Sequence, residues 1–285
     1  MHTTQTNFRN RVRRAALKAA AGTSILLCTL GAWSPAQASS LGVEPLYLEL
    51  RPSGSATVRV SNNADGQMPV EVFIWRRDVD EAGNQTRTPA DDDFIVFPPQ
   101  AVVGARSTQA FRLQAVTPKA AESASYYVSF SQVPQDMLPD ADVATQIQVV
   151  FAFDAAVHVV PPRAKPDLSL DSQSLARMRM EVPTGEFEAL PTGQQRPISR
   201  MADVAAVDLT VSNSGNRFAY LHQQNIRAKI TDTSGKTSDY IWSEDDIANA
   251  IKVTLLEPNE TRRMRLPLPE GLEPAKVEIR MSSGS

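Results

Sequence analysis

The sequence holds very little cysteine and histidine, which narrows the chemistry open to it. Of its 285 residues one is a cysteine, Cys28, and three are histidines. Nucleophilic catalysis needs a base beside a serine or cysteine, and beyond the N-terminal segment only His158 and His222 could serve as one. The sequence also has no Gly-x-Ser-x-Gly elbow. We therefore expect a protein that is not an enzyme.

Binding sites for cofactors, metals and nucleic acids are also missing from the sequence. It has no glycine-rich loop of the phosphate-cradling type, so no cofactor is expected. The acidic run Asp91–Asp93 does not have cation-site spacing, because consecutive strand residues point in opposite directions, and we interpret it as solvated charge. After residue 38 the chain has 24 basic against 32 acidic residues, a net charge of −8. Neither a nucleic-acid partner nor a small-molecule substrate is expected.

The first 38 residues have the pattern of an export signal. Five basic residues lie between positions 9 and 18, a short apolar stretch follows over 19–33, and Ala36-Gln37-Ala38 is a small-residue cleavage site. We expect cleavage after Ala38, which would remove Cys28 and leave no disulfide. Arg13-Arg14 is similar to a twin-arginine signal, so general and twin-arginine export both stay open. No apolar stretch of about 18 residues follows, and a soluble mature protein is expected.

The remainder of the chain predicts an all-β fold. From Val43 to Val160, short runs rich in Val, Ile, Phe and Tyr alternate with turn clusters, which is typical of an immunoglobulin-like β-sandwich. The proline-rich stretch 161–166 then indicates a domain boundary, and we expect one sandwich over 39–162 and a smaller one over 163–285. The segment 184–200, rich in Pro, Gly, Gln and Thr, is interpreted as a long loop. The expected strands are 46–50, 56–62, 68–77, 94–97, 107–114, 125–133 and 145–160 in the first domain, and 205–212, 226–231, 251–256, 261–268 and 276–281 in the second.

The stretch 92–114, DDFIVFPPQAVVGARSTQAFRLQ, combines two strands with a defined stop and turn. Pro98 and Pro99 cannot donate ladder hydrogen bonds and end the first strand, and Gly104 permits the tight return. Its residue order resembles the Phe-x-x-x-Pro-Pro … Gly … Leu/Phe-Arg-Leu/Ile signature of the PapD-like periplasmic pilus chaperones. The resemblance implies a periplasmic protein that uses no cofactor and binds pilin or fimbrial subunits and an outer-membrane usher-type assembly platform. Arg112 matches a family arginine near the domain junction, although a solvated charge on the strand explains this residue equally well.

The stretch 145–160, TQIQVVFAFDAAVHVV, alternates apolar residues with period two. This places Ile147, Val149, Phe151 and Phe153 on one face of a strand. The pattern alone fits a long core strand. In the PapD-like family the corresponding strand is lent to an incomplete subunit, a mechanism called donor-strand complementation. The resemblance therefore implies that these four residues bind the subunit.

The sequence departs from the family at the site that holds the subunit's terminal carboxylate. The family's arginine and lysine correspond to Leu48 and Ala156, and neither side chain can bind a carboxylate. Either the alignment is shifted, or strand pairing acts alone, or another residue substitutes. Candidate substitutes are Arg51, Arg59, Tyr47 and His158. We do not carry the anchor over.

A hypothesis of another class stays open. The chain could be an exported structural or adhesive β-sandwich protein that keeps its seventh strand for itself. Such a protein would tolerate polar substitutions at outward donor positions, whereas a chaperone would lose its client.

Overall fold

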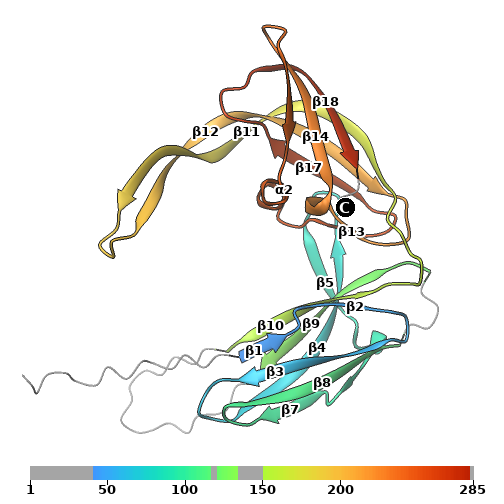
Figure 1. Cartoon of the computed structure of the whole chain (residues 1–285). Helices are drawn as coiled ribbons and strands as arrows, with labels where there is room; N and C mark the ends of the chain where they lie inside the picture. The colour runs from blue at the N-terminus through green and yellow to red at the C-terminus, as the bar shows by residue number, and fades with distance from the viewer. Residues whose placement is uncertain (1–40, 117–120, 134–149, 283–285) are drawn as a thin grey trace, which may run out of the picture. The chain divides into compact units, whose positions relative to one another are not determined.

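The computed structural model describes residues 41–116, 121–133 and 150–282, which form two β-sandwiches (Figure 1). The expected all-β fold of two immunoglobulin-like sandwiches in tandem is confirmed. No helix within these ranges is long and apolar enough to cross a bilayer.

The first sandwich packs two sheets face to face. The strand order is β1-β3-β8-β6 in one sheet and β2-β10-β9-β4-β5 in the other, where β7 also pairs with β4. A 3-10 helix, η1 (Asp91–Asp93), precedes β6. The strands are β1 (Leu41–Glu44), β2 (Tyr47–Leu50), β3 (Ser55–Asn62), β4 (Met68–Val79), β5 (Gln85–Pro89), β6 (Phe94–Phe97), β7 (Gln100–Val103), β8 (Ser107–Ala115), β9 (Ala124–Gln132) and β10 (Ala152–Val159).

Period-two alternation builds the core between these sheets. In β8, Phe111 and Leu113 are fully buried, while Arg112 between them is exposed. Phe111 meets Phe130 of β9, in the other sheet, edge to face at 5.4 Å between ring centroids. Such aromatic pairs add stability beyond the area they bury.

The chain changes sheets near its start. β1 pairs antiparallel with β3, whereas β2 pairs in parallel with β10, from Ala156↔Tyr47 to Val159↔Leu50. The sequence predicted one strand over 46–50 and missed β1. Pro45 lies at the crossing, where a residue without an N–H breaks no ladder.

The strand expected over 145–160 is shorter at its start. β10 begins at Ala152, and Val150 and Phe151 lie outside the strand, while 145–149 are outside the described residues. β10 is short at this end because its partner strand β9 stops at Gln132. The last bond between the two segments is donated by the Gln132 N–H to the Phe151 carbonyl, at 2.9 Å. Apolar alternation carries no information about the length of a partner strand.

The second sandwich consists of the sheets β11-β12-β17 and β15-β14-β18 and the strand pair β13-β16. Its core includes Val207, Leu209, Ile226 and Leu266, all nearly fully buried. The elements are β11 (Leu168–Ala189), β12 (Gln195–Asn213), β13 (Ala219–Tyr220), η2 (Leu221–Gln223), β14 (Asn225–Asp232), β15 (Thr237–Ile241), α2 (Glu244–Ala250), β16 (Leu255–Leu256), β17 (Thr261–Pro267) and β18 (Pro274–Ser282).

The region before β17 differs from the sequence-based expectation. A strand was expected over 251–256, but only Leu255–Leu256 form one, and the helix α2 precedes it. Ser243 caps α2 by accepting from the Asp246 N–H, and the Asp246 carboxylate accepts from the Ser243 N–H in return. This reciprocal capping satisfies two backbone donors and fixes the start of the helix.

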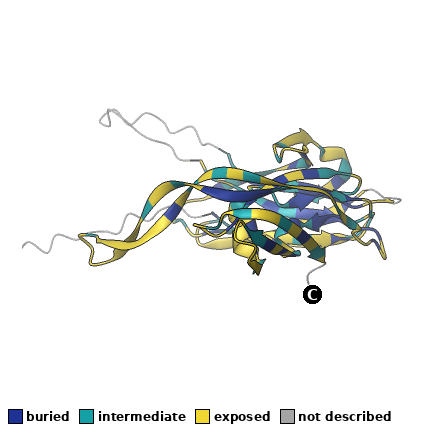
Figure 2. Ribbon diagram, turned by 90° about the horizontal axis from the view of Figure 1, so that it is seen from above, coloured by how far each residue is buried: buried dark blue, intermediate teal, exposed yellow. Residues whose placement is uncertain are grey.

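The prediction of a loop over 184–200 is wrong, because these residues form the end of a long hairpin. β11 and β12 stay paired out to Ala189↔Gln195, with register shifts at Leu170/Ser172 and Pro183/Phe187. β17 pairs with β12 only between Ala206 and Ser212, so the distal hairpin is a two-stranded ribbon. The ribbon is mostly exposed (Figure 2). It therefore gains little from burial.

Shortening this hairpin is expected to leave the fold intact. An isolated two-stranded ribbon is at best marginally stable, and its exposed ion pairs contribute little. Replacement of residues 181–201 by Asn-Gly, which favours a two-residue hairpin turn, should shift the melting temperature by only a few degrees. Calorimetry of both proteins measures this shift. A fall of more than about 10 °C would show that the ribbon stabilises the sandwich.

Candidate functional site

Among the described residues, strand β10 is paired on only one side along its first half, which we call its free edge. β9 pairs with it from Ala152 to Val159, and β2 covers its other side only from Ala156 onward. The Ala156 N–H donates to the Leu46 carbonyl at 2.8 Å, and the Val160 N–H donates to the Leu50 carbonyl at 2.7 Å. Within the part of the chain that the structure describes, no strand pairs with this second side over residues 152–155. Unpaired backbone groups on such an edge are a template for another strand.

The backbone groups that face the free edge follow from the ladder. Alternate residues of an antiparallel strand bond to opposite sides. Because the Ala156 N–H points toward β2, the N–H groups of Ala152 and Asp154 point the same way, into the free edge. Phe153 and Ala155 direct their backbone groups to β9 instead. Two residues therefore offer donors and acceptors to an added strand.

The side chains of this segment continue the core toward its open end. Ala155 and Val157 are fully buried, whereas Phe153 and Phe151 are half-buried and pack against the same core. Of the four subunit-binding residues expected from the sequence, Phe151 and Phe153 lie on this apolar row. Ile147 and Val149 are outside the described residues.

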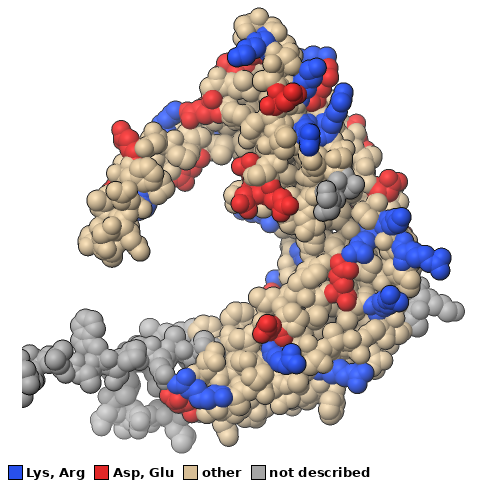
Figure 3. Space-filling model, in the orientation of Figure 1, with Lys and Arg blue, Asp and Glu red and all other residues tan. Residues whose placement is uncertain are grey.

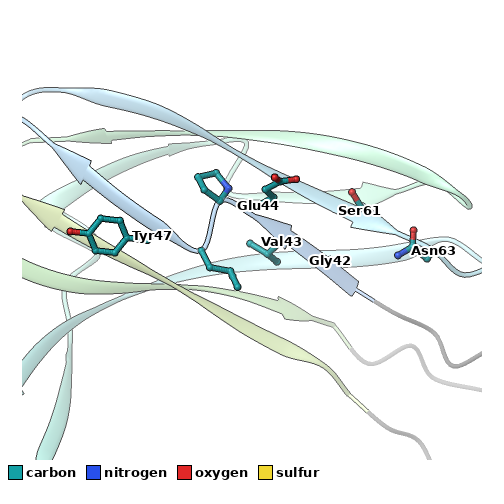
Figure 4. Close-up of a pocket in the computed structure, with 8 residues that line it drawn as sticks. Gly42, Val43, Glu44, Tyr47, Ser61 and Asn63 are labelled. Atoms are coloured by element: carbon teal, nitrogen blue, oxygen red, sulfur yellow. The ribbon is translucent and has the colours of Figure 1, made fainter. Parts of the chain in front are cut away.

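A shallow pocket adjoins the crossing between β1 and β2. Its volume is about 730 Å³, and Figure 4 shows the residues around it. Leu46 and Tyr47 are 52% and 47% exposed there. Exposed apolar side chains that gather beside an unpaired edge are typical of interaction sites. The pocket is lined by Gly42, Val43, Glu44, Pro45, Leu46, Tyr47, Ser61 and Asn63.

Leu48 and Ala156, the two positions that correspond to the carboxylate-binding pair, carry no positive charge. Leu48 packs against the core, and Ala156 lies opposite Tyr47. The Tyr47 hydroxyl donates to Glu49 Oε1 at 2.7 Å. His158 is fully buried, and burial, with the nearby arginines, lowers its pKa to about 3. Its imidazole is therefore neutral and cannot pair with a carboxylate at neutral pH.

Arg51 and Arg59, the remaining candidate substitutes, are exposed, as is Arg112. Arg112 lies on the outer face of β8 and donates to Ser55 Oγ at 3.2 Å. The ion pairs between the two sandwiches come from other arginines: Arg217 bonds Glu49 at 2.7 Å, and Arg263 bonds Glu81 at 2.7 Å. The expected role of Arg112 at the junction stays a prediction.

The acidic run Asp91–Asp93 takes part in local hydrogen bonds. Asp91–Asp93 form η1, and two of the three have structural partners. Asp91 accepts from the Ile74 N–H at 3.3 Å, and Asp93 accepts from the Tyr126 hydroxyl at 2.8 Å. No group of three or more metal-ligating side chains gathers among the described residues. Acidic and basic side chains are interspersed on the face shown in Figure 3.

Sequence-based reasoning missed two features of this site. One is the cover that β2 places over half of β10, and the other is the exposed pair of Leu46 and Tyr47. The only available signal was Pro45, which marks a break in the apolar run 43–50. A parallel pairing between segments about 110 positions apart leaves no local pattern.

A comparison with known families finds one match, which covers most of the first sandwich. Residues 49–165 match the family model described as pili and flagellar-assembly chaperone, PapD N-terminal domain. No curated protein matches the sequence.

Among solved structures, the chain is similar to the Class 5 fimbriae chaperone CfaA, with 13% identity, 86% of this chain and 100% of that chain covered, and a TM-score of 0.49. It is similar to the E. coli chaperone DraB, with 15% identity, coverage of 86% and 97%, and a TM-score of 0.45. It is also similar to the Pseudomonas aeruginosa CupB2 chaperone, with 10% identity, coverage of 85% and 100%, and a TM-score of 0.37.

Proposed function

Because the chain belongs, through residues 49–165, to the PapD-like pilus-assembly chaperones, we propose that it binds pilus or fimbrial subunits by donor-strand complementation. The binding element is the free first half of β10 together with the residues that precede it. An incomplete subunit lacks its last strand and leaves its core open. The chaperone supplies a strand by backbone pairing and fills the open core with alternate side chains.

The observation that carries this proposal is the half-covered edge of β10. Its N–H groups at Ala152 and Asp154 face outward, and the half-buried Phe151 and Phe153 lie next to it. Each apolar side chain that becomes fully buried contributes roughly 1.5 to 3 kcal/mol. A few such contacts, added to the backbone bonds, suffice to hold a subunit and to block its self-association.

The other parts of the function follow from the family. The protein acts in the periplasm after removal of residues 1–38, and delivers its client to an usher-type platform at the outer membrane. It needs no cofactor. The missing basic pair at Leu48 and Ala156 means that strand pairing, rather than a carboxylate anchor, supplies most of the affinity.

Co-purification from the native periplasm tests this function. The protein carries an affinity tag at its C-terminus and is expressed under pilus-producing conditions, and mass spectrometry identifies what elutes in a one-to-one complex. A small β-rich exported subunit is the expected result and names the client. A clean monomer would contradict the proposal and favour the exported structural β-sandwich.

A further inference from the structure

The two sandwiches meet through a defined set of polar contacts. The Phe218 N–H donates to Ser123 Oγ at 2.7 Å, and the Ser123 N–H donates to the Asn216 carbonyl at 2.9 Å. Both bonds join the start of β9 to the turn before β13. These two amides therefore report directly on whether the junction is packed.

His158 extends from β10 into this junction. Its ring stacks on Phe218 at 4.0 Å, and its Nε2 lies 2.9 Å from the Tyr220 hydroxyl, both in the second sandwich. Its Nδ1 lies 2.6 Å from Ser125 Oγ of β9. The side chain is fully buried, and the basic groups around it, Arg77 and Arg217, oppose a positive charge. The packed junction therefore requires a neutral imidazole.

Glu257 enters the same junction from the second sandwich. It is 5% exposed, and neither carboxyl oxygen has a hydrogen-bond partner among the described residues. Burial raises its pKa to about 7, and this rise is opposed by the Ser125 hydroxyl, which lies near the carboxyl without a well-formed hydrogen bond, and by the Arg76 and Arg77 guanidiniums. The packed junction therefore favours a neutral carboxyl as well.

The other charged groups in this region do not reverse the upward shift of the Glu257 pKa. Glu260 raises the pKa of Glu257 further, and burial raises the pKa of Glu260 as well. Arg262, fully buried on β17, donates to the Val253 and Leu255 carbonyls, and Tyr220 has a raised pKa. Asp78 and Asp80 lie close enough to influence Glu260 and Arg262, respectively.

We propose that His158 and Glu257 form an opposed pair of buried titratable groups that keeps the packing of this junction nearly independent of pH between about pH 5 and pH 8. The pair lies on opposite sides of one interface and shares Ser125 as a neighbour. Each group alone makes the junction pH-sensitive, in opposite directions. Together their effects cancel.

Proton linkage gives the direction in which each group changes the stability of the packed junction with pH. The packed junction lowers the pKa of His158 from 6.5 to about 3. The contribution of neutral His158 to the stability of the packed junction is therefore complete above pH 6.5 and is lost as the pH falls toward 3. The pKa of Glu257 rises from 4.5 to about 7, so its support is complete below 4.5 and is lost as pH rises toward 7. Between 4.5 and 6.5 one loss offsets the other.

Amide hydrogen exchange at Phe218 and Ser123 tests the pair. Protection factors are compared at about pH 5 and pH 8 for the wild type, Glu257→Gln and His158→Gln. We expect wild-type protection to change by no more than about threefold. In Glu257→Gln it should be up to roughly 30-fold higher at pH 8, and in His158→Gln up to roughly 70-fold lower there.

The outcomes that overturn the proposal are specific. It fails if wild-type protection changes more than about tenfold, or if Glu257→Gln follows the wild-type profile. It also fails if core amides such as Val58 and Leu209 shift as much as the two junction amides, because the pair would then act on the whole fold. If His158→Gln does not fold, the comparison of the wild type with Glu257→Gln decides alone.

Discussion

Ala152→Pro is expected to lower the amount of co-purified subunit at least tenfold while leaving the chaperone folded. The N–H of Ala152 points into the free edge of β10, so proline removes one outward donor and places its ring where an added strand would lie. The bonds of β10 to β9 are kept, because they come from the alternate residues. One hydrogen bond and the steric block together correspond to more than about 1.4 kcal/mol, or tenfold in affinity.

Ala152→Val is the matched control, since it keeps the N–H and enlarges an exposed side chain. It should retain the subunit. Melting temperatures of both variants within a few degrees of the wild type would show that binding and not folding has changed. Full co-purification with Ala152→Pro would exclude the free half of β10 as the pairing edge.

Asn213→Ala is expected to lower the free energy of unfolding by about 3 kcal/mol or more. Asn213 is 1% exposed at the end of β12, and its amide makes five bonds to the backbone. Its Nδ2 donates to the carbonyls of Arg217, Leu256 and Glu257, and its Oδ1 accepts from the N–H groups of Asp167 and Gly215. Alanine leaves these buried groups without partners.

Urea denaturation measures this loss, with Asn216→Ala as control. Asn216 lies in the same turn but is exposed, and its side chain bonds only the Lys165 N–H and the Ala121 carbonyl in the described part of the chain. Water can replace these partners, so a loss of about 1 kcal/mol or less is expected. Equal losses in the two variants would contradict the role assigned to the buried amide.

The first sandwich could be predicted well from local patterns, because its buried strands alternate cleanly. β8 is the clearest case, with Phe111 and Leu113 inside and Arg112 outside. The long hairpin could not be predicted in the same way. Its distal strands pair in solvent, so no buried face imposes period-two apolarity, and Pro183 and Gly185 are typical of a loop.

The candidate site could be predicted only in part from the sequence. Period two identified the apolar row that contains Phe151 and Phe153, because alternation is local. The burial of His158 depends on Phe218 and Tyr220, some 60 positions away, and its sequence context indicated only a strand. The cap of α2 did have a local signal, Ser243 three residues before Asp246, which was missed because the usual third-position residue is Glu or Gln.

The strand β2 also sets a limit on how a partner can align. Because β2 occupies the side of β10 from Ala156 onward, an added strand can extend only as far as Ala155 before it meets β2. A shift of one residue would turn every side chain of that strand to the wrong face. In the proposed complex, the start of β2 at Tyr47 would therefore be a physical stop that limits how far a partner strand can slide along the edge.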